Sequence, residues 1–395
     1  MSTTELNVAQ YSAPKRLMRG LLVTAGVGLL CFLVGLFIEP TRAWGGFLMG
    51  FTTYTTICLA GAVFVTVLSL SGARWATALR RIPEAMSVGL PYGLLLGLVL
   101  MGGVNSLYEW THASVVDADQ LLSDKAGYLN VPGFFIRMVV FFGLWIGLSR
   151  AIVAASRGQD SSDDPAAESL RLKWRAVWFL PVFAITFSLA SIDWMQSLEP
   201  HWFSTIYGLI TLSGMATSGL AVCIILVVYL RRSGHLRGIA SRDHLDDLGK
   251  LVIGFSLFWG YIWYCQHMLI WYTNIPEETP YYFIRRQGNW QLLSWINVTL
   301  NWAIPFFALM PKGARRNATI LVRVAVIMLA GQALQMFMLI APPLMDGPPS
   351  VGLWELGPLA GAFALAFWAT LRSLGQAPLV PLRDPTLQDS LHHHC

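Results

Sequence analysis

Ionisable side chains gather beside aromatic rings and amides in three short segments of this sequence, residues 107–112, 191–202 and 271–282. The carboxylates and the histidine of the second and third segments are Asp193, Glu199, His201, Glu277 and Glu278. Such groups accept and release protons when their surroundings shift the pKa toward the working pH. The segments therefore suggest proton transfer at one membrane surface. The alternative is an interfacial belt of Trp and Tyr with solvated or helix-capping acids.

His267 is the one histidine that lies well inside an apolar run. At about 1.5 Å per helical residue, it lies roughly 24 Å from Leu251, where that run begins. Tyr264 precedes it by three residues and shares its helix face. The pair could pass a proton or hydrogen-bond a quinone carbonyl, and the alternative is a histidine that only packs.

Two features of the sequence argue against a redox cofactor in this chain. The five cysteines form neither C-x-x-C nor C-x-x-C-H, so no iron–sulfur or c-type haem cradle is predicted. Bis-histidine haem ligation needs two imidazoles at similar depth, whereas His112 and His201 belong to loops. We expect no cofactor bound by this chain, and quinol is the one small ligand that its residues suggest.

Polar residues also occur deeper in the apolar runs. Asn297 and Asn301 are spaced i, i+4, Gln332 and Gln335 are spaced i, i+3, and threonines crowd residues 52–56. Such residues mostly hydrogen-bond neighbouring helices, and a hydrated path between helices is the alternative.

Glu84 follows Pro83 at the start of an apolar run, which is the usual composition of a helix first turn. An acid there complements the helix dipole, so we interpret Glu84 as a cap. Proton uptake from the cytoplasm is the alternative.

Membrane-spanning helices must position these residues. The chain has 395 residues, of which 55% are hydrophobic and 12% are charged, a composition suited to lipid. Crossing the hydrocarbon core takes roughly 20 apolar helical residues. The predicted fold is an all-α integral membrane domain of about ten helices over residues 20–371, between cytoplasmic segments 1–19 and 372–395. The predicted spans are residues 20–38, 47–70, 83–104, 133–155, 176–192, 203–230, 251–272, 290–310, 320–344 and 357–371.

Basic residues predict the orientation of these spans. With ten spans both termini lie on one side, and by our count that side carries 22 of the 27 Lys and Arg residues. The positive-inside rule places it in the cytoplasm of a bacterial inner membrane. The net charge of +5 is then a topology signal and indicates no nucleic-acid partner. We interpret residues 158–175 and 231–250 as solvated cytoplasmic connectors and residues 392–395 as an uninformative tail.

Two of the segments resemble a known family. Residues 191–208 read Ser-Ile-Asp-Trp-Met-Gln-Ser-Leu-Glu-Pro-His-Trp-Phe-Ser-Thr-Ile-Tyr-Gly, and residues 269–282 read Leu-Ile-Trp-Tyr-Thr-Asn-Ile-Pro-Glu-Glu-Thr-Pro-Tyr-Tyr. Both resemble the signature segments of ActF, a family of membrane subunits of alternative complex III. That complex is the quinol:electron-acceptor oxidoreductase of bacterial respiratory and photosynthetic chains. The run Ile-Pro-Phe-Phe-Ala-Leu-Met at residues 304–310 agrees, and the span pattern extends the resemblance over nearly the whole chain.

The resemblance implies a fold and a set of partners. ActF belongs with the NrfD-like polysulfide-reductase membrane subunits, so spans two to five and six to nine would form two four-helix bundles with flanking helices. Iron–sulfur clusters and c-type haems would lie in partner subunits. The sister subunit ActC carries the better supported quinol site beside the iron–sulfur subunit ActB, and ActF members are discussed as proton-translocating elements. A terminal oxidase is a further expected partner.

The sequence departs from the family pattern at two positions. Gln266-His267 stands where relatives commonly have Gln-Tyr, and Asn301 stands where a histidine is expected before the Ile-Pro-Phe segment. If relatives pass protons through either position, the route here uses other groups. The predicted route is an outer half-channel that ends near His267, with no continuous path to Glu84.

Three functions are open on the sequence. The first is a non-haem membrane subunit of alternative complex III that supports quinol oxidation, with proton translocation as a further role. The second is a stand-alone proton or solute transporter, although paired Gly/Pro interruptions in two halves are not evident. The third is a structural membrane anchor. For the first, we expect residues 193–201 and 274–282 to lie together and to contact extramembrane redox subunits.

Overall fold

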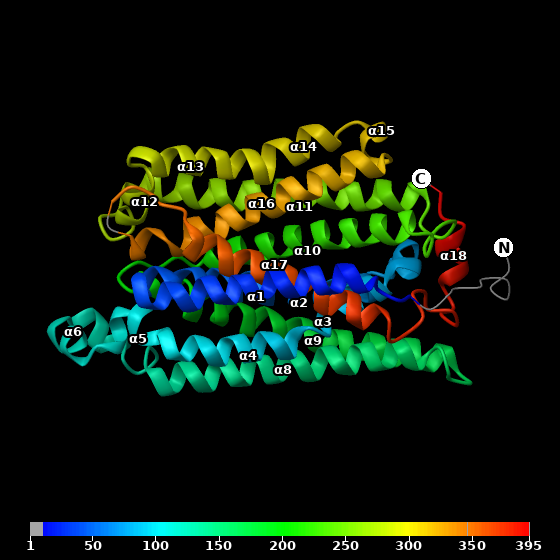
Figure 1. Ribbon diagram of the computed structural model, residues 1–395, viewed down its shortest axis with the longest axis horizontal. Helices are drawn as coiled ribbons and strands as arrows, with labels where there is room; N and C mark the ends of the chain where they lie inside the picture. Colours follow the sequence, from blue (N-terminus) through cyan, green and yellow to red (C-terminus); the bar gives the residue numbers. More distant parts are fainter. Residues whose placement is uncertain (1–10, 346, 395) are drawn as a thin grey trace.

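The computed structural model describes residues 11–345 and 347–394, and every regular element within them is a helix. The long helices run side by side along one axis (Figure 1). We call the end that carries α6 (Ala113–Ala118), α7 (Gln120–Lys125) and α12 (Pro280–Arg285) the far end. The opposite end, with α18 (Leu387–Leu391), is the termini end.

Nine helical stretches of the described residues are long and apolar enough to cross a membrane, which confirms an all-α membrane protein. The tenth expected span lies within α17 (Leu353–Leu374), which is not among the nine. The nine are α1 (Lys15–Ile38), α2 (Pro40–Leu70), α3 to α5 (Arg81–Leu107), α8 (Val131–Gly158), α9 (Pro165–Trp194) with the turn after it, α10 (Tyr207–Arg232), α11 (Arg242–Thr273), α13 to α14 (Gly288–Leu309) and α16 (Ala318–Ile340).

These helices form two four-helix bundles, as the resemblance implied. In the first, α2 packs on α3 (Arg81–Ser87), α4 (Leu90–Leu100) and α9, while α8 packs on α4 and α9. In the second, α10 packs on α11 and α16. Helix α14 (Ile304–Leu309) packs on both α11 and α16, and α13 (Gly288–Val298) packs on α16. The flanking helices α1 and α17 pack on each other and on α2.

The bundles meet along α10, the most deeply buried of the nine helices. Its middle turns carry small residues, which let other backbones approach closely in a membrane. A Cβ atom on Gly219 would lie only 2.2 Å from the Cβ atom of Ala60 on α2. The hydroxyl groups of Ser213 and Thr217 donate to carbonyls one turn back, so these polar atoms are satisfied within the helix.

A π-helical turn, Thr299–Ala303, joins α13 to α14. It precedes Pro305, whose ring has no N–H to donate to the carbonyl of Asn301. The helix therefore widens locally before the proline, as π turns do. The turn places the Asn301 side chain inside the second bundle, where the residue is 1% exposed.

The described segment that precedes the predicted tail is packed, and His393 of that tail lies 2.5 Å from Asp247. The segment folds back onto the 3-10 helix η2 (Arg74–Leu79) at the termini end. Ser390 Oγ accepts a hydrogen bond from the Ala78 amide at 3.1 Å and donates to the Trp75 carbonyl at 2.5 Å. At the other end of the described chain, the Tyr11 carbonyl oxygen lies 3.1 Å from the Cβ position of Gly375, just after α17, so the two ends lie near each other.

The contact of α1 with α17 gives the first testable prediction. A Cβ atom on Gly28 would lie 2.5 Å from the Gly357 carbonyl oxygen, so the two backbones leave no room for a side chain. We expect Gly28→Leu to lower the free energy of unfolding by about 1–3 kcal/mol through overpacking. Gly26→Leu on the same helix is the matched control, because nothing lies within 4 Å of its Cβ position. Detergent-solubilised protein would be unfolded by heat, and equal effects of the two changes would contradict this close contact.

Candidate functional site

A cavity of about 600 Å³ lies in the far half of the second bundle, among α11, α12, α13 and α16. We call it the far-end cavity. Helix α11 packs on α14 and on the π turn but diverges from α13, so the cavity opens sideways between them. Tyr261, Tyr264 and Trp295 line this opening and are more than half exposed. An apolar molecule dissolved in a membrane could therefore enter without crossing water.

His267 lines the far-end cavity and has an unpaired ring nitrogen. Its ring is stacked on Trp263 at a centroid distance of 5.8 Å and meets the edge of Tyr282 at 4.9 Å. Nδ1 of His267 and Nε2 of Gln266 are buried atoms with no hydrogen-bond partner among the described residues. Buried polar atoms are normally satisfied, so these two atoms mark a place for a polar ligand group or water.

Arg285 closes the inner wall of the far-end cavity and neutralises Glu199. Its guanidinium group donates to both carboxylate oxygens of Glu199, at 2.9 and 3.2 Å, and to the Met338 carbonyl at 3.2 Å. It also lies over the Tyr281 ring, 3.5 Å from the centroid. Burial raises the pKa of Tyr281 to about 12, so this phenol stays protonated at neutral pH.

The two acidic far-end segments are in contact, as expected. Trp202 stacks on Tyr281 with 4.0 Å between ring centroids and donates from its indole nitrogen to the Glu278 carbonyl at 3.1 Å. The Glu277 side chain is exposed, and Glu278 is half-buried. The segments thus form a single polar and aromatic surface above the cavity.

Asp193 and His201 lie outside the far-end cavity and have other partners. Asp193 is buried in the first bundle, where Arg137 of α8 donates to both its oxygens at 2.7 and 3.1 Å. His201 is exposed and lies 2.5 Å from Asp119. That hydrogen bond is the main reason that the pKa of Asp119 is lowered. The expected proton-transfer acids are therefore divided between the two bundles.

Four amide side chains form a ladder that starts at the far-end cavity. Asn297 donates to Gln335 at 2.5 Å, Asn301 donates to Asn297 at 2.8 Å, and Gln332 donates to Asn301 at 2.6 Å. The ladder joins α13 and the π turn to α16, which is the helix-bonding role predicted from the spacing. Gln332 Oε1 has no hydrogen-bond partner among the described residues and faces Gly214 of α10. Amides at this spacing join helices and do not titrate.

Glu84 lies in the first turn of α3, as predicted, but it is fully buried, so the interpretation as a simple cap is incomplete. It accepts hydrogen bonds from Arg80 at 3.1 Å, from Arg81 at 2.8 Å and from Ser156. Two arginines therefore fix this carboxylate at the termini end. The sequence interpretation rested on Pro83 and the helix dipole, so it identified neither the two arginines nor Ser156 as partners of Glu84.

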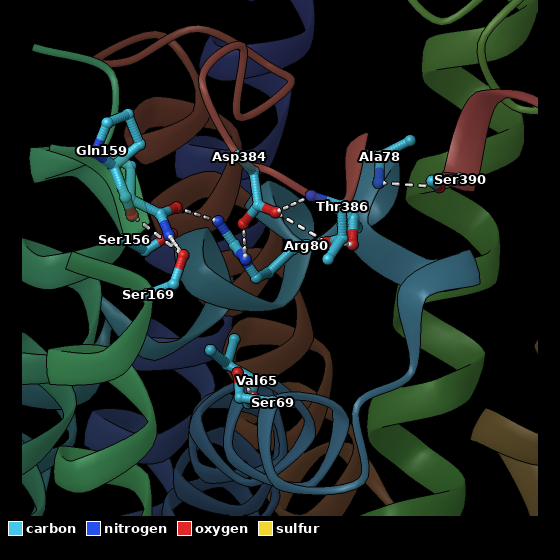
Figure 2. Close-up of polar contacts among 12 residues, drawn as sticks. Val65, Ser69, Ala78, Arg80, Ser156, Gln159, Ser169, Asp384, Thr386 and Ser390 are labelled. Carbon is cyan, nitrogen blue, oxygen red and sulfur yellow. Dashed lines mark hydrogen bonds and ion pairs between the residues drawn. The ribbon is translucent and has the colours of Figure 1, made fainter. Parts of the chain in front are cut away.

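Figure 2 shows how this network extends across the termini end. Arg80 donates to Asp384 and to Gln159, both at 2.6 Å, and Gln159 donates to Ser169 at 2.7 Å. Burial acts to raise the pKa of Asp384, but Arg80 and hydrogen bonds from Thr386 outweigh it, so the pKa is lowered. The carboxylate thus stays charged and paired down to acidic pH.

The two connectors interpreted as merely solvated contain ion-pairing residues that are partly or fully buried, which corrects that interpretation. In the first connector, Asp160 pairs with Arg81 at 2.5 Å. In the second, the buried Asp246 pairs with Arg315 at 2.7 Å. An Asp-rich loop looks solvated in sequence because its basic partners are distant along the chain.

Sequence reasoning missed Arg137 and Arg285 as site residues and used them only to count charges. A signal was present, because an arginine beside an apolar run usually has a carboxylate partner. The partner could not be chosen from the sequence, since several acids lie at the same predicted depth.

Known proteins add no constraint on this site. No family model matches the chain, and no curated protein matches it. The resemblance to ActF therefore rests on the quoted segments, which form the surface above the far-end cavity and part of its lining.

The Arg285–Glu199 pair gives the second prediction. Replacing Arg285 with Met would leave the Glu199 carboxylate largely buried without its cation, which costs roughly 3–5 kcal/mol for a buried pair. We expect a lower unfolding midpoint for Arg285→Met. Arg286→Met is the matched control, because Arg286 is exposed. Adding Glu199→Gln to Arg285→Met should restore part of the loss, and a double variant no more stable than Arg285→Met would rule out the unpaired charge as the cause.

Proposed function

We propose that this chain is a non-haem membrane subunit of a quinol:electron-acceptor oxidoreductase of the alternative complex III type, and that its far-end cavity takes the quinol headgroup. The observation that carries the proposal is the pair of unpartnered buried nitrogens, His267 Nδ1 and Gln266 Nε2, in a cavity that opens to lipid. A quinol is apolar along its tail and has hydroxyl oxygens at its head. The aromatic opening suits the apolar tail, and the few convergent polar groups suit the hydroxyl oxygens.

The chemistry assigned to this chain is proton handling. Oxidation of a quinol to a quinone releases two electrons and two protons. A neutral His267 can accept a hydrogen bond from one quinol hydroxyl through its unprotonated nitrogen, while Gln266 donates to the quinol oxygen. The iron–sulfur clusters and c-type haems expected in partner subunits would accept the two electrons. The imidazole can pass a proton toward the acids of the far end.

The orientation follows from the basic residues. The termini end takes the cytoplasmic position in a bacterial inner membrane, because 22 of the 27 Lys and Arg residues belong to that side by our count. The far-end cavity then lies in the periplasmic half, and quinol protons leave outward. The joined surface of Trp202, Tyr281 and the exposed Glu277 faces the periplasm and is suited to docking the extramembrane redox subunits.

Binding of a quinone to the purified complex tests this proposal. A photoreactive quinone should label peptides of α11 and α13. We expect His267→Phe to weaken binding about three- to tenfold, because one hydrogen bond to the headgroup is lost. Leu269→Phe, which adds a ring on the exposed face of the same helix, should leave binding unchanged. Equal labelling in both variants would contradict binding of the quinol headgroup in the far-end cavity. It would favour the role of a structural membrane anchor for this chain.

Proton counting tests the route. We expect Glu84→Gln to leave the proton-to-electron ratio of reconstituted complex unchanged, because the ladder between the cavity and the termini end contains amides and Glu84 is fixed by two arginines. Glu168→Gln, also at the termini end, is the control for assembly. A lower ratio in Glu84→Gln alone, with quinol oxidation continuing, would demonstrate a full transmembrane path and overturn the half-channel.

A further inference from the structure

A long apolar groove runs along the seam between the two bundles. Helices α9 and α11 form its walls, α10 forms its floor and α2 lies along one edge. Its volume is about 390 Å³, and its lining is almost entirely apolar. The lining residues on α10 extend from Gly208 to Val227, which is about 28 Å at the rise of an α-helix. The groove therefore has nearly the length of the hydrocarbon core of a membrane.

The groove is open to the membrane along its length. Its rim residues Val67, Leu180 and Leu209 are between about one third and one half exposed, although each lies beside a bundle interior. Helices α9 and α11 each pack on α10 without closing on each other. A chain-like apolar molecule can thus lie in the seam with its flank toward bulk lipid.

A polar hollow of about 380 Å³ continues the groove at the termini end. The two share Leu68 and Ala76 as lining residues, so they are contiguous. The hollow contains the Arg80, Gln159 and Ser169 network drawn in Figure 2. The apolar groove therefore ends in a polar hollow at the depth where a lipid headgroup lies.

The charge of this hollow favours an anion. Its charged lining residues are three cations, Arg74, Arg80 and Lys173, and one carboxylate, Asp384. Arg80 is neutralised by Asp384 and by Glu84, which it shares with Arg81, and Arg74 forms only an exposed pair with Asp389. Lys173 is exposed and has no hydrogen bond or ion pair among the described residues. The polar hollow thus retains positive charge that can bind a phosphate group.

We propose that the seam binds an anionic phospholipid, with an acyl chain in the groove and the phosphate beside Lys173 and Arg74. The lipid fills the open seam between the two bundles from the termini-end leaflet. This site is independent of the far-end cavity and of quinol binding. An apolar groove of acyl-chain length that ends in a cationic hollow favours an anionic phospholipid.

The headgroup half is tested with purified protein and vesicles or nanodiscs of phosphatidylglycerol or phosphatidylcholine with identical chains. Native mass spectrometry should show retained phosphatidylglycerol and little phosphatidylcholine. Lys173→Gln and Arg74→Gln should each weaken phosphatidylglycerol retention roughly fivefold. Lys15→Gln with Arg19→Gln, which removes two exposed cations at the same end, is the control and should change nothing. Equal retention of the two lipids by the parent protein would overturn the proposal.

The acyl half is tested with phosphatidylglycerol that carries a photoreactive chain. Crosslinks should concentrate on α9 and α11 and should be lost in Ala184→Trp, which fills the groove. Ile185→Trp places the same ring on the exposed side of α9, outside the groove lining, and should keep the crosslinks. Equal crosslinking in both variants would overturn the proposal. So would displacement of the crosslink by a polyprenyl quinone, because the groove would then take a quinone tail.

Discussion

The pairing of the buried arginines Arg80, Arg81 and Arg285 with carboxylates is the constraint on which this structure depends. A charge taken out of water without a partner costs several kcal/mol, so each such group must find its counterion where the fold places it. The pairs join elements far apart in sequence and therefore fix the connectors to the helices. They include Arg42–Glu355, Arg137–Asp193 and Arg285–Glu199 at the far end, and Arg80–Asp384, Arg81–Asp160 and Arg315–Asp246 at the termini end.

The same constraint shapes the far-end cavity. Arg285 is held from one side by Glu199 and from another by the Met338 carbonyl, so α12 is fixed across the top of α16. The two connectors that contain Trp202 and Tyr281 are thereby held in place above the point where α11 and α13 diverge. A cavity can persist in a packed bundle only when its roof does not collapse inward. Here the roof is held by a charged hydrogen-bonding group and not by apolar filling.

Much of the fold was accessible from the sequence, since hydropathy reports how deep a residue lies. The spans, the joined segments around Trp202 and Tyr281, and the shared face of Asn297 and Asn301 follow from depth and helical spacing. The direction in which a side chain points around its helix axis depends on which helix lies beside it. For this reason the partners of Asp193 and Glu84 were not predicted. The cavity itself was also missed, because it arises from the divergence of two helices.

The return of the last described segment to η2 has a consequence for biogenesis. Arg80 and Asp384 are separated by 304 positions, so at about 5–20 residues per second the ribosome reaches the aspartate roughly 15–60 s after the arginine. Glu84 is synthesised directly after Arg80 and can neutralise it during insertion. Asp384, the second carboxylate, is synthesised only after α17 is complete. Synthesis of all the long helices therefore precedes closure of this end over the first bundle.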